Sequence, residues 1–455
     1  MFFKKKIYLS LLLGFFISSL ISIYYVSKYD VYEVSSDNLE NHQMIKGPPG
    51  IYWQQAHKLK EDLKQNKNYF KTGDEYRNPY LPSKIIFIFS SLVDLELIDE
   101  FNNIKIDKKK VFILIIQTII YYLSILFFYK EIKKEYDERS SLFIVTFLAL
   151  EPTLLLFHSS FWSESIFFSI QIIFFTLLIK NSKNFTINFI AGFVLGLLFL
   201  QRSVAMLYIF PVIFYYILIF KKNFIKPSIF LICGYLFVLI FIGYHNHSRS
   251  GIFYISPTQS KDGFYKYMLP SVISKKDNIS ILQAKDLLKS KEKVWIEENN
   301  IDLKKEKDLL FYYNFLQKES FRIIVENPII SATHVLKKTI HFVVLDPLRH
   351  VHFYYKYEYK GKPETRYYQS ETHMNMIPFR IIYTLLVYSI SFCGLIYLYK
   401  NNKKNHLLFV VLSLLYFTAV CSWIGNTRYF TPCLIYLSLL FGNGLNLIGN
   451  YIKKL

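Results

Sequence analysis

The chain has 455 residues, of which 52% are hydrophobic, 18% are aromatic and 19% are charged. A disordered chain is not this apolar, and 16 Gly, 14 Pro and 4 Cys exclude collagen-like and disulfide-stapled classes. The apolar residues come in long runs divided by lysine clusters, which predicts an all-α integral membrane protein, a polytopic helical bundle. The membrane interpretation also explains the net charge of +20, because lysines gather at the cytoplasmic ends of spans. We therefore expect no nucleic-acid partner.

About ten runs are long enough to cross a bilayer, which takes about 20 apolar residues. The first, at about 7–26, is too long for a signal peptide and has no small-residue cleavage site, so it predicts an anchor. The other expected spans cover about 111–129, 141–158, 165–180, 187–201, 204–220, 228–244, 381–399, 407–424 and 430–449. All four cysteines fall in such runs and predict no disulfide, metal site or redox role.

Basic clusters occupy every second connection between the expected spans. They fall around 130–139, 180–183, 221–226 and 400–404, and at 453–454. On the other side, the short connections carry Arg202 and Arg428 as their only basic residues. The positive-inside rule therefore predicts that both termini are cytoplasmic. The expected division is an N-terminal transmembrane bundle over 1–244 with a periplasmic loop at 27–110, a periplasmic region with amphipathic helices at 245–380, and C-terminal transmembrane helices at 381–455.

Three segments outside these spans predict other kinds of helix. Lys84 to Ile98 is apolar but short, and two acids interrupt its end, so we interpret it as an interfacial or re-entrant helix. Residues 281–316 indicate a charged, solvated helix. Residues 321–344 are amphipathic and break at Asn327-Pro328, and we expect them to lie along the membrane surface.

The first loop holds one of four places where polar residues at the outer ends of spans suggest chemistry. The spacing of Tyr52, Ala56, Leu59 and Leu63 places them on one face of a helix. This predicts a surface helix that packs on the bundle. Further on, Asp74 and Glu75 precede Arg77 and the segment from Pro79 to Pro82, whose prolines favour an extended form. A carboxylate here could act as a general base on an acceptor hydroxyl, or could be solvated charge alone.

The other three places lie between later spans. Glu164 stands at the mouth of a span, where an ionisable group is functional by default, whereas we interpret His158 as an interfacial histidine rather than a metal ligand. Arg202 could grip a lipid phosphate or extend to the headgroups, and Arg428 beside Tyr429 has the same two interpretations. The sequence has no phosphate-binding loop, zinc motif or nucleophile elbow, so nucleotide hydrolysis and zinc chemistry have no support.

Together these motifs resemble the polytopic GT-C glycosyltransferases, and more closely the bacterial relatives of protein O-mannosyltransferases and of the lipid A aminoarabinose transferase. Tyr52 and Ala56 match the first-loop spacing of that family, and RNPYLP at 77–82 is similar to its Pro-rich element. Its later motifs are similar to residues that follow here in the same order, namely Pro152 and Glu164, then Gly192, Gly196 and Arg202, then Arg428, Tyr429 and Pro432. The sequence departs at the family's catalytic aspartate, whose position is Pro48.

The resemblance implies a glycosyltransferase of the bacterial inner membrane that takes a sugar from a polyprenyl-phosphate donor and passes it to a periplasmic acceptor. Either Asp74, Glu75 or Asp37 replaces the missing base, or the motif is misaligned, or this member is inactive. Arg202 and Arg428 would hold the lipid phosphate. The other residues that would line the active cavity are Tyr52, Arg77, His158, Glu164 and Tyr429. We expect no cofactor, and a divalent metal stays open. Two alternatives remain: an O-antigen polymerase or ligase, which would rely on arginines, and a non-enzymatic flippase or transporter of lipid-linked sugars.

Overall fold

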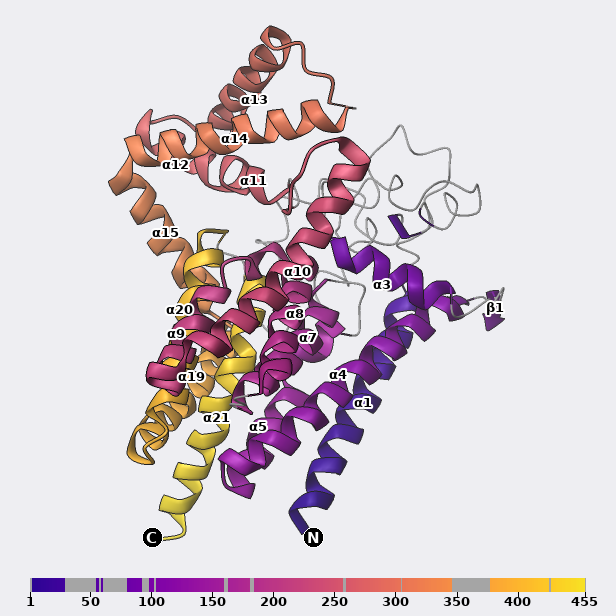
Figure 1. The fold of residues 1–455 in the computed structure, drawn as a ribbon, viewed down its shortest axis with the longest axis vertical. Coiled ribbons are helices and arrows are strands. Elements are labelled where there is room, and N and C mark those ends of the chain that lie inside the picture. The colour runs from indigo at the N-terminus through magenta and orange to yellow at the C-terminus, as the bar shows by residue number, and fades with distance from the viewer. Residues whose placement is uncertain are drawn as a thin grey trace.

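The computed structural model is a bundle of long helices with a smaller helical domain at one end (Figure 1). Both termini lie at the opposite end of the bundle from that domain (Figure 1). We name the end that carries the domain the outer end, and the domain the outer domain. The structure describes residues 2–28, 55–56, 59, 80–91, 98–101, 104–158, 163–180, 184–256, 259–303, 305–345, 377–424 and 427–454.

The bundle confirms the predicted fold class of a polytopic helical membrane protein. Its helices are α1 (Phe2–Lys28), α4 (Lys108–Glu135), α5 (Glu138–Leu150), α6 (Pro152–His158), α7 (Glu164–Ile179), α8 (Phe185–Gln201), α9 (Ile209–Phe220), α10 (Ile225–Ser250), α19 (Ile377–Lys400), α20 (Lys404–Cys421) and α21 (Thr431–Ile452). Short 3-10 segments are η3 (Ser203–Ala205), η4 (Lys221–Asn223), η7 (Ser422–Ile424) and η8 (Thr427–Phe430). Each expected span corresponds to a helix of this set, or to the pair α5 and α6.

The expected number of ten spans is approximate. Among the described residues, 7 helices are long and apolar enough to cross a membrane, or 8 if α5 and α6 form one span. These two helices meet at an angle of 50°, so the span expected at about 141–158 is broken. The break follows from Pro152, which cannot continue a helix but can open one. α7 and α8 are apolar but shorter than 18 residues.

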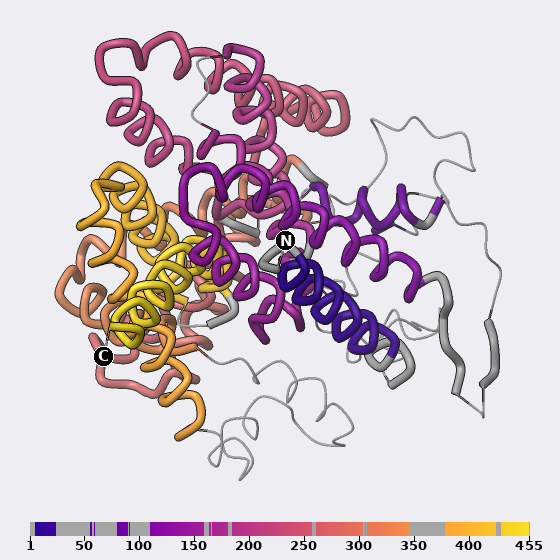
Figure 2. Tube along the Cα trace, turned by 90° about the horizontal axis from the view of Figure 1, so that it is seen from below, coloured from indigo at the N-terminus to yellow at the C-terminus, as the bar shows by residue number. Residues whose placement is uncertain are grey.

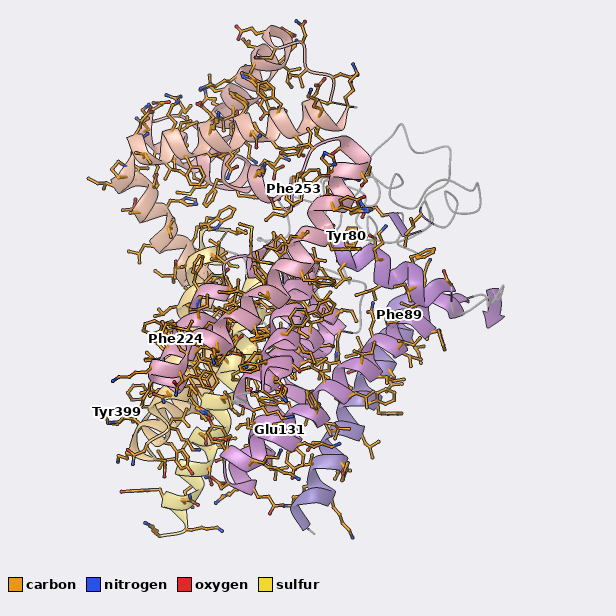
Figure 3. The ribbon with its side chains drawn as sticks, in the orientation of Figure 1. Tyr80, Phe89, Glu131, Phe224, Phe253 and Tyr399 are labelled. Carbon is orange, nitrogen blue, oxygen red and sulfur yellow. The ribbon has the colours of Figure 1, made fainter. Side chains whose placement is uncertain are left out.

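The helices alternate in direction, in agreement with the predicted alternation of loops. Phe224, Glu131 and Tyr399, beside three of the basic clusters, lie nearer the terminus-bearing end than Tyr80 and Phe253 do (Figure 3). Seen from the terminus-bearing end, the C-terminal helices α19 to α21 group on one side and α1, α3 and α4 on the other (Figure 2). The cytoplasmic location of the termini stays a prediction.

The segment before α4 is a short helix followed by a hairpin. α3 (Tyr80–Ser91) begins inside the stretch expected to be extended, because Pro82 falls in its first turn, where proline is tolerated. It ends at Ser91 rather than at Ile98, and it is not long enough to span. The antiparallel strands β1 (Ile98–Phe101) and β2 (Ile104–Asp107), which the sequence analysis did not predict, pair Ile98 with Asp107.

Glycines let two pairs of bundle helices approach closely. A Cβ atom on Gly192 of α8 would lie 1.8 Å from the carbonyl oxygen of Leu231 on α10. On the facing helix, a Cβ on Gly234 would lie 2.1 Å from the carbonyl oxygen of Phe189. Between α19 and α21, Gly394 has the same role against Leu440. Small residues at these crossings allow backbone packing, which is the main source of helix association in a bilayer.

The outer domain has its own core. Its helices are α11 (Gln259–Gly263), η5 (Phe264–Met268), α12 (Leu269–Lys276), α13 (Ile281–Glu298), α14 (Glu306–Glu326) and α15 (Pro328–Val343). The charged helix expected over 281–316 is therefore two helices, and Ser280 caps the first with a capping box. The predicted break at Asn327-Pro328 is confirmed. Tyr265, Leu269 and Leu316 are fully buried where these helices meet.

Candidate active site

Three helix ends converge at the outer end of the bundle. α7 begins at Glu164, α8 ends at Gln201, and α21 begins after η8. Gln201 donates a hydrogen bond from Nε2 to the Ser163 carbonyl oxygen at 2.8 Å, which joins the end of α8 to the start of α7. Gln171 likewise donates from Nε2 to the Pro432 carbonyl oxygen at 2.9 Å, which joins α7 to α21. Side-chain amides therefore join both α8 and α21 to α7.

A buried ion pair lies at this junction. Arg202 Nη1 is 3.1 Å from Glu164 Oε1, and the two side chains are only 6% and 0% exposed. Arg202 follows directly after α8 as its C-terminal cap and has an extended backbone. Glu164 stands in the first turn of α7, where the helix dipole favours negative charge, and Ser163 Oγ donates to its Oε2 at 3.2 Å. Desolvation of two charges is costly, so such a pair is weak evidence for stability and better evidence for function.

Aromatic rings flank the guanidinium. Its central carbon lies 5.6 Å from the ring centre of Phe167 and 5.2 Å from that of Tyr429. Both distances fall within the range of cation–π attraction. Phe167 comes from α7 and Tyr429 from η8, so three segments fix the position of one guanidinium. The interpretation of Arg202 as a side chain that extends to lipid headgroups does not agree with this burial.

The predicted site residues fall into three groups. The structure brings together Glu164, Arg202 and Tyr429. His158 lies instead among α1 and α4, with Nε2 2.9 Å from Ser18 Oγ and its ring 4.3 Å from that of Tyr121. The remaining predicted residues lie outside the described residues or have undescribed side chains, so their roles stay predictions: Asp37, Tyr52, Asp74, Glu75, Arg77 and Arg428.

The packing face predicted for the first loop is described at two positions. Ala56 is 3% exposed and Leu59 is 1% exposed. Both therefore lie against the protein, as the helical spacing predicts. Tyr52 and Leu63, the other two residues of that face, are outside the described residues.

Glu151 is a candidate to which the sequence analysis gave no role. It lies buried in the break between α5 and α6. Its carboxylate accepts hydrogen bonds from Leu154 N at 2.8 Å, Thr153 Oγ1 at 2.9 Å and Tyr383 Oη at 3.0 Å. The first bond caps α6, the second joins the Glu151 side chain to that of Thr153, and the third ties the break to α19. The signal in the sequence was an acid directly before a proline inside an apolar run.

Comparisons with known proteins give a family match over part of the chain and a similar fold. A sequence model of the family described as dolichyl-phosphate-mannose-protein mannosyltransferase matches residues 97–245, about a third of the chain, which include Glu164 and Arg202. No curated protein sequence matches the chain. Among the described residues, no group of three or more His, Cys, Asp or Glu side chains is placed to hold a metal ion.

Two solved structures are similar to the chain. One is the archaeal oligosaccharyltransferase AglB from Archaeoglobus fulgidus in complex with an inhibitory peptide and a dolichol-phosphate, at 12% identity and a TM-score of 0.50 over 100% of this chain and 51% of that chain. The other is a crystal structure of the Archaeoglobus fulgidus oligosaccharyltransferase with Zn and sulfate, at 11% identity and a TM-score of 0.48 over 97% of this chain and 49% of that one. The chain thus spans about half the length of the solved structures it matches.

The protein is a polytopic helical membrane protein whose fold is similar to that of the archaeal oligosaccharyltransferase AglB. Its residues 97–245 carry the sequence pattern of the dolichyl-phosphate-mannose-protein mannosyltransferases. These two findings agree with the resemblance to the GT-C glycosyltransferases, and the closer likeness to the lipid A aminoarabinose transferase stays a prediction. The same match covers two of the three residues that meet at the junction of α7, α8 and α21.

Proposed function

We propose that the protein is a membrane glycosyltransferase that transfers a sugar from a polyprenyl-phosphate donor to an acceptor at the outer end of the bundle. The observation that carries the proposal is the buried pair of Arg202 and Glu164, flanked by Tyr429, at that end. The family match over 97–245 and the shared fold support it. The outer end would face the periplasm, as the distribution of lysines predicts.

Arg202 would bind the donor phosphate. A guanidinium can hold two phosphate oxygens at once, and the interaction strengthens as the leaving phosphate gains charge in the transition state. Glu164 would orient the guanidinium, and the rings of Phe167 and Tyr429 would keep water away from it. Arg428, in the same 3-10 segment as Tyr429, would be a second phosphate ligand.

A carboxylate of the first loop would remove the proton from the acceptor. In that step the acceptor oxygen forms a bond to the anomeric carbon from the face opposite the phosphate, and the bond from that carbon to the phosphate oxygen breaks. The proton goes to the carboxylate and the polyprenyl phosphate leaves, so the anomeric centre inverts. Because Pro48 stands at the family's aspartate position, we propose Asp74 or Glu75 as the base, with Asp37 in reserve.

The test uses the full-length protein in lipid nanodiscs with synthetic polyprenyl-phosphate sugars, and measures release of polyprenyl phosphate. Arg202→Lys keeps the charge but loses the fork, so it should weaken donor binding less than Arg202→Ala does. Arg322→Ala, in the outer domain, is the matched control and should change neither binding nor release. Unchanged donor binding and release in Arg202→Ala would refute the phosphate role.

The base is tested separately. Replacement of the true base by its amide should lower turnover by about 10²-fold or more and leave donor binding intact. The variants are Asp74→Asn, Glu75→Gln and Asp37→Asn. If all three keep full turnover in an active preparation, the base lies elsewhere, and an arginine-dependent polymerase or ligase becomes the better explanation.

A further inference from the structure

α15 turns its apolar side outward. Ile329, Leu336 and Ile340 are 78%, 67% and 61% exposed. At 100° per residue these three positions fall within about 40° of one another, so they form one stripe along the helix. The opposite face, with Ser331 and His334, is buried against the protein. A helix on a water-facing surface has the reverse arrangement, with its polar side exposed.

The end of α15 lies beside the outer half of a membrane span. Tyr388 of α19 donates from Oη to the Val343 carbonyl oxygen at 2.7 Å, and Leu345 N donates to Thr384 Oγ1 at 3.0 Å. The span of α19 begins at Pro378. Tyr388 therefore lies about 15 Å along that span at 1.5 Å per residue, roughly half of a hydrocarbon core about 30 Å thick. Figure 1 shows α15 running from the outer domain down to the bundle.

We propose that the stripe of Ile329, Leu336 and Ile340 inserts into the outer leaflet of the membrane, with lipid acyl chains as its occupant. α15 would then enter the leaflet obliquely rather than lie along the membrane surface. Lipid fits better than a protein partner because the neighbouring span is itself apolar and exposed, with Ile382 63% and Leu385 61% exposed. Lys337, next to the stripe and exposed, can extend its ammonium group to lipid phosphates.

The contact has a structural consequence for the candidate site. On its buried side, Phe342 of α15 packs edge-to-face on Phe430, with ring centres 5.3 Å apart. Phe430 follows Tyr429, whose ring lies on Arg202. Lipid that covers the stripe therefore holds α15 against the segment that carries Tyr429. The lipid contact itself does not depend on the proposed glycosyl transfer.

The experiment measures collision rates of a nitroxide label in nanodiscs. Cys233 and Cys393 are replaced by Ala so that they do not react with the label. Cys421 and Cys433 are buried and are kept. Leu336→Cys carries the label, and Ile340→Cys is a second variant in case the first does not fold. The matched control is Leu282→Cys on α13, where the native leucine is 71% exposed.

Labels at Leu336 and Ile340 should collide several-fold more often with oxygen, which concentrates in lipid, than with a water-soluble nickel complex. The label at Leu282 should show the reverse. Equal access of the nickel complex to Leu336 and Leu282 would overturn the proposal. Low collision rates for both reagents, together with dipolar coupling between labels on two molecules, would also overturn it and would make a second copy of the chain the occupant.

Discussion

Removal of one partner of the buried ion pair should destabilise the protein strongly. Arg202→Met keeps much of the side chain's volume and its contacts with Phe167 and Tyr429, but it leaves the Glu164 carboxylate buried without its cation. Breaking a buried pair in this way costs about 3–5 kcal/mol. We therefore expect the free energy of unfolding of Arg202→Met to fall by that amount.

The assay is denaturant unfolding of the protein in a defined detergent, with Lys293→Met as control. The Lys293–Glu297 pair has its charged atoms 3.9 Å apart and both side chains largely exposed. Exposed pairs contribute about 0–1 kcal/mol, so this control should be nearly neutral. Both variants lose one positive charge, but the Arg202–Glu164 pair is buried and the Lys293–Glu297 pair is exposed.

The double variant Glu164→Leu and Arg202→Met separates stability from function. Replacing both charges by apolar groups removes the unpaired carboxylate and should recover most of the lost stability. The donor phosphate would still lose its guanidinium, so polyprenyl phosphate release should stay low. If Arg202→Met is as stable as the native protein, Glu164 must be solvated or protonated, and the reasoning from a dry ion pair is refuted.

Three further predictions concern packing, pH and the helix break. Gly192→Leu should separate α8 from α10, because a Cβ atom there meets the Leu231 carbonyl oxygen, and should lower the free energy of unfolding by about 1–3 kcal/mol. Denaturant unfolding of the variant in detergent measures this, and an unchanged free energy would contradict the close packing. Burial raises the pKa of Glu319, but Arg322 and Lys291 lower it overall by hydrogen bonds and charge. The stability this adds is present above about pH 4.3 and is lost as the pH falls through the lowered pKa. The protection factors of amides in α13 and α14, which correct the exchange rate for its own dependence on pH, should therefore fall at low pH in the native protein, and less so in Glu319→Gln. Glu151→Ala should remove the cap of α6 and leave the Tyr383 hydroxyl without its acceptor, which should lower the free energy of unfolding by about 1–3 kcal/mol. An unchanged free energy of unfolding would show that the break needs no cap.

The sequence was sufficient to predict the helices of the bundle because the signal for each is local. A run of about 20 apolar residues between basic clusters has few other interpretations. The hairpin at 98–107 was missed because its two strands have 4 residues each and lack a strong turn signal. The break at Glu151 has a local cause in Pro152. The sequence did not show it because two bent helices and one straight span have the same apolar composition.

The candidate site could be predicted only as separate residues. Glu164 and Arg202 each stood out at the mouth of a span, yet nothing in the sequence showed that they pair, since that depends on how the ends of α7 and α8 meet. The same limit applies to α15. Its periodicity showed an amphipathic helix, and only the packed structure shows that the apolar face of that helix is the one turned away from the protein.

The most direct test of the central claim is a structure of the protein in nanodiscs with a polyprenyl phosphate bound. We predict that the phosphate lies at the junction of α7, α8 and α21, within hydrogen-bond distance of the Arg202 guanidinium and with a first-loop carboxylate nearby. A phosphate bound at the terminus-bearing end, or at the outer end but away from Arg202, would contradict the claim.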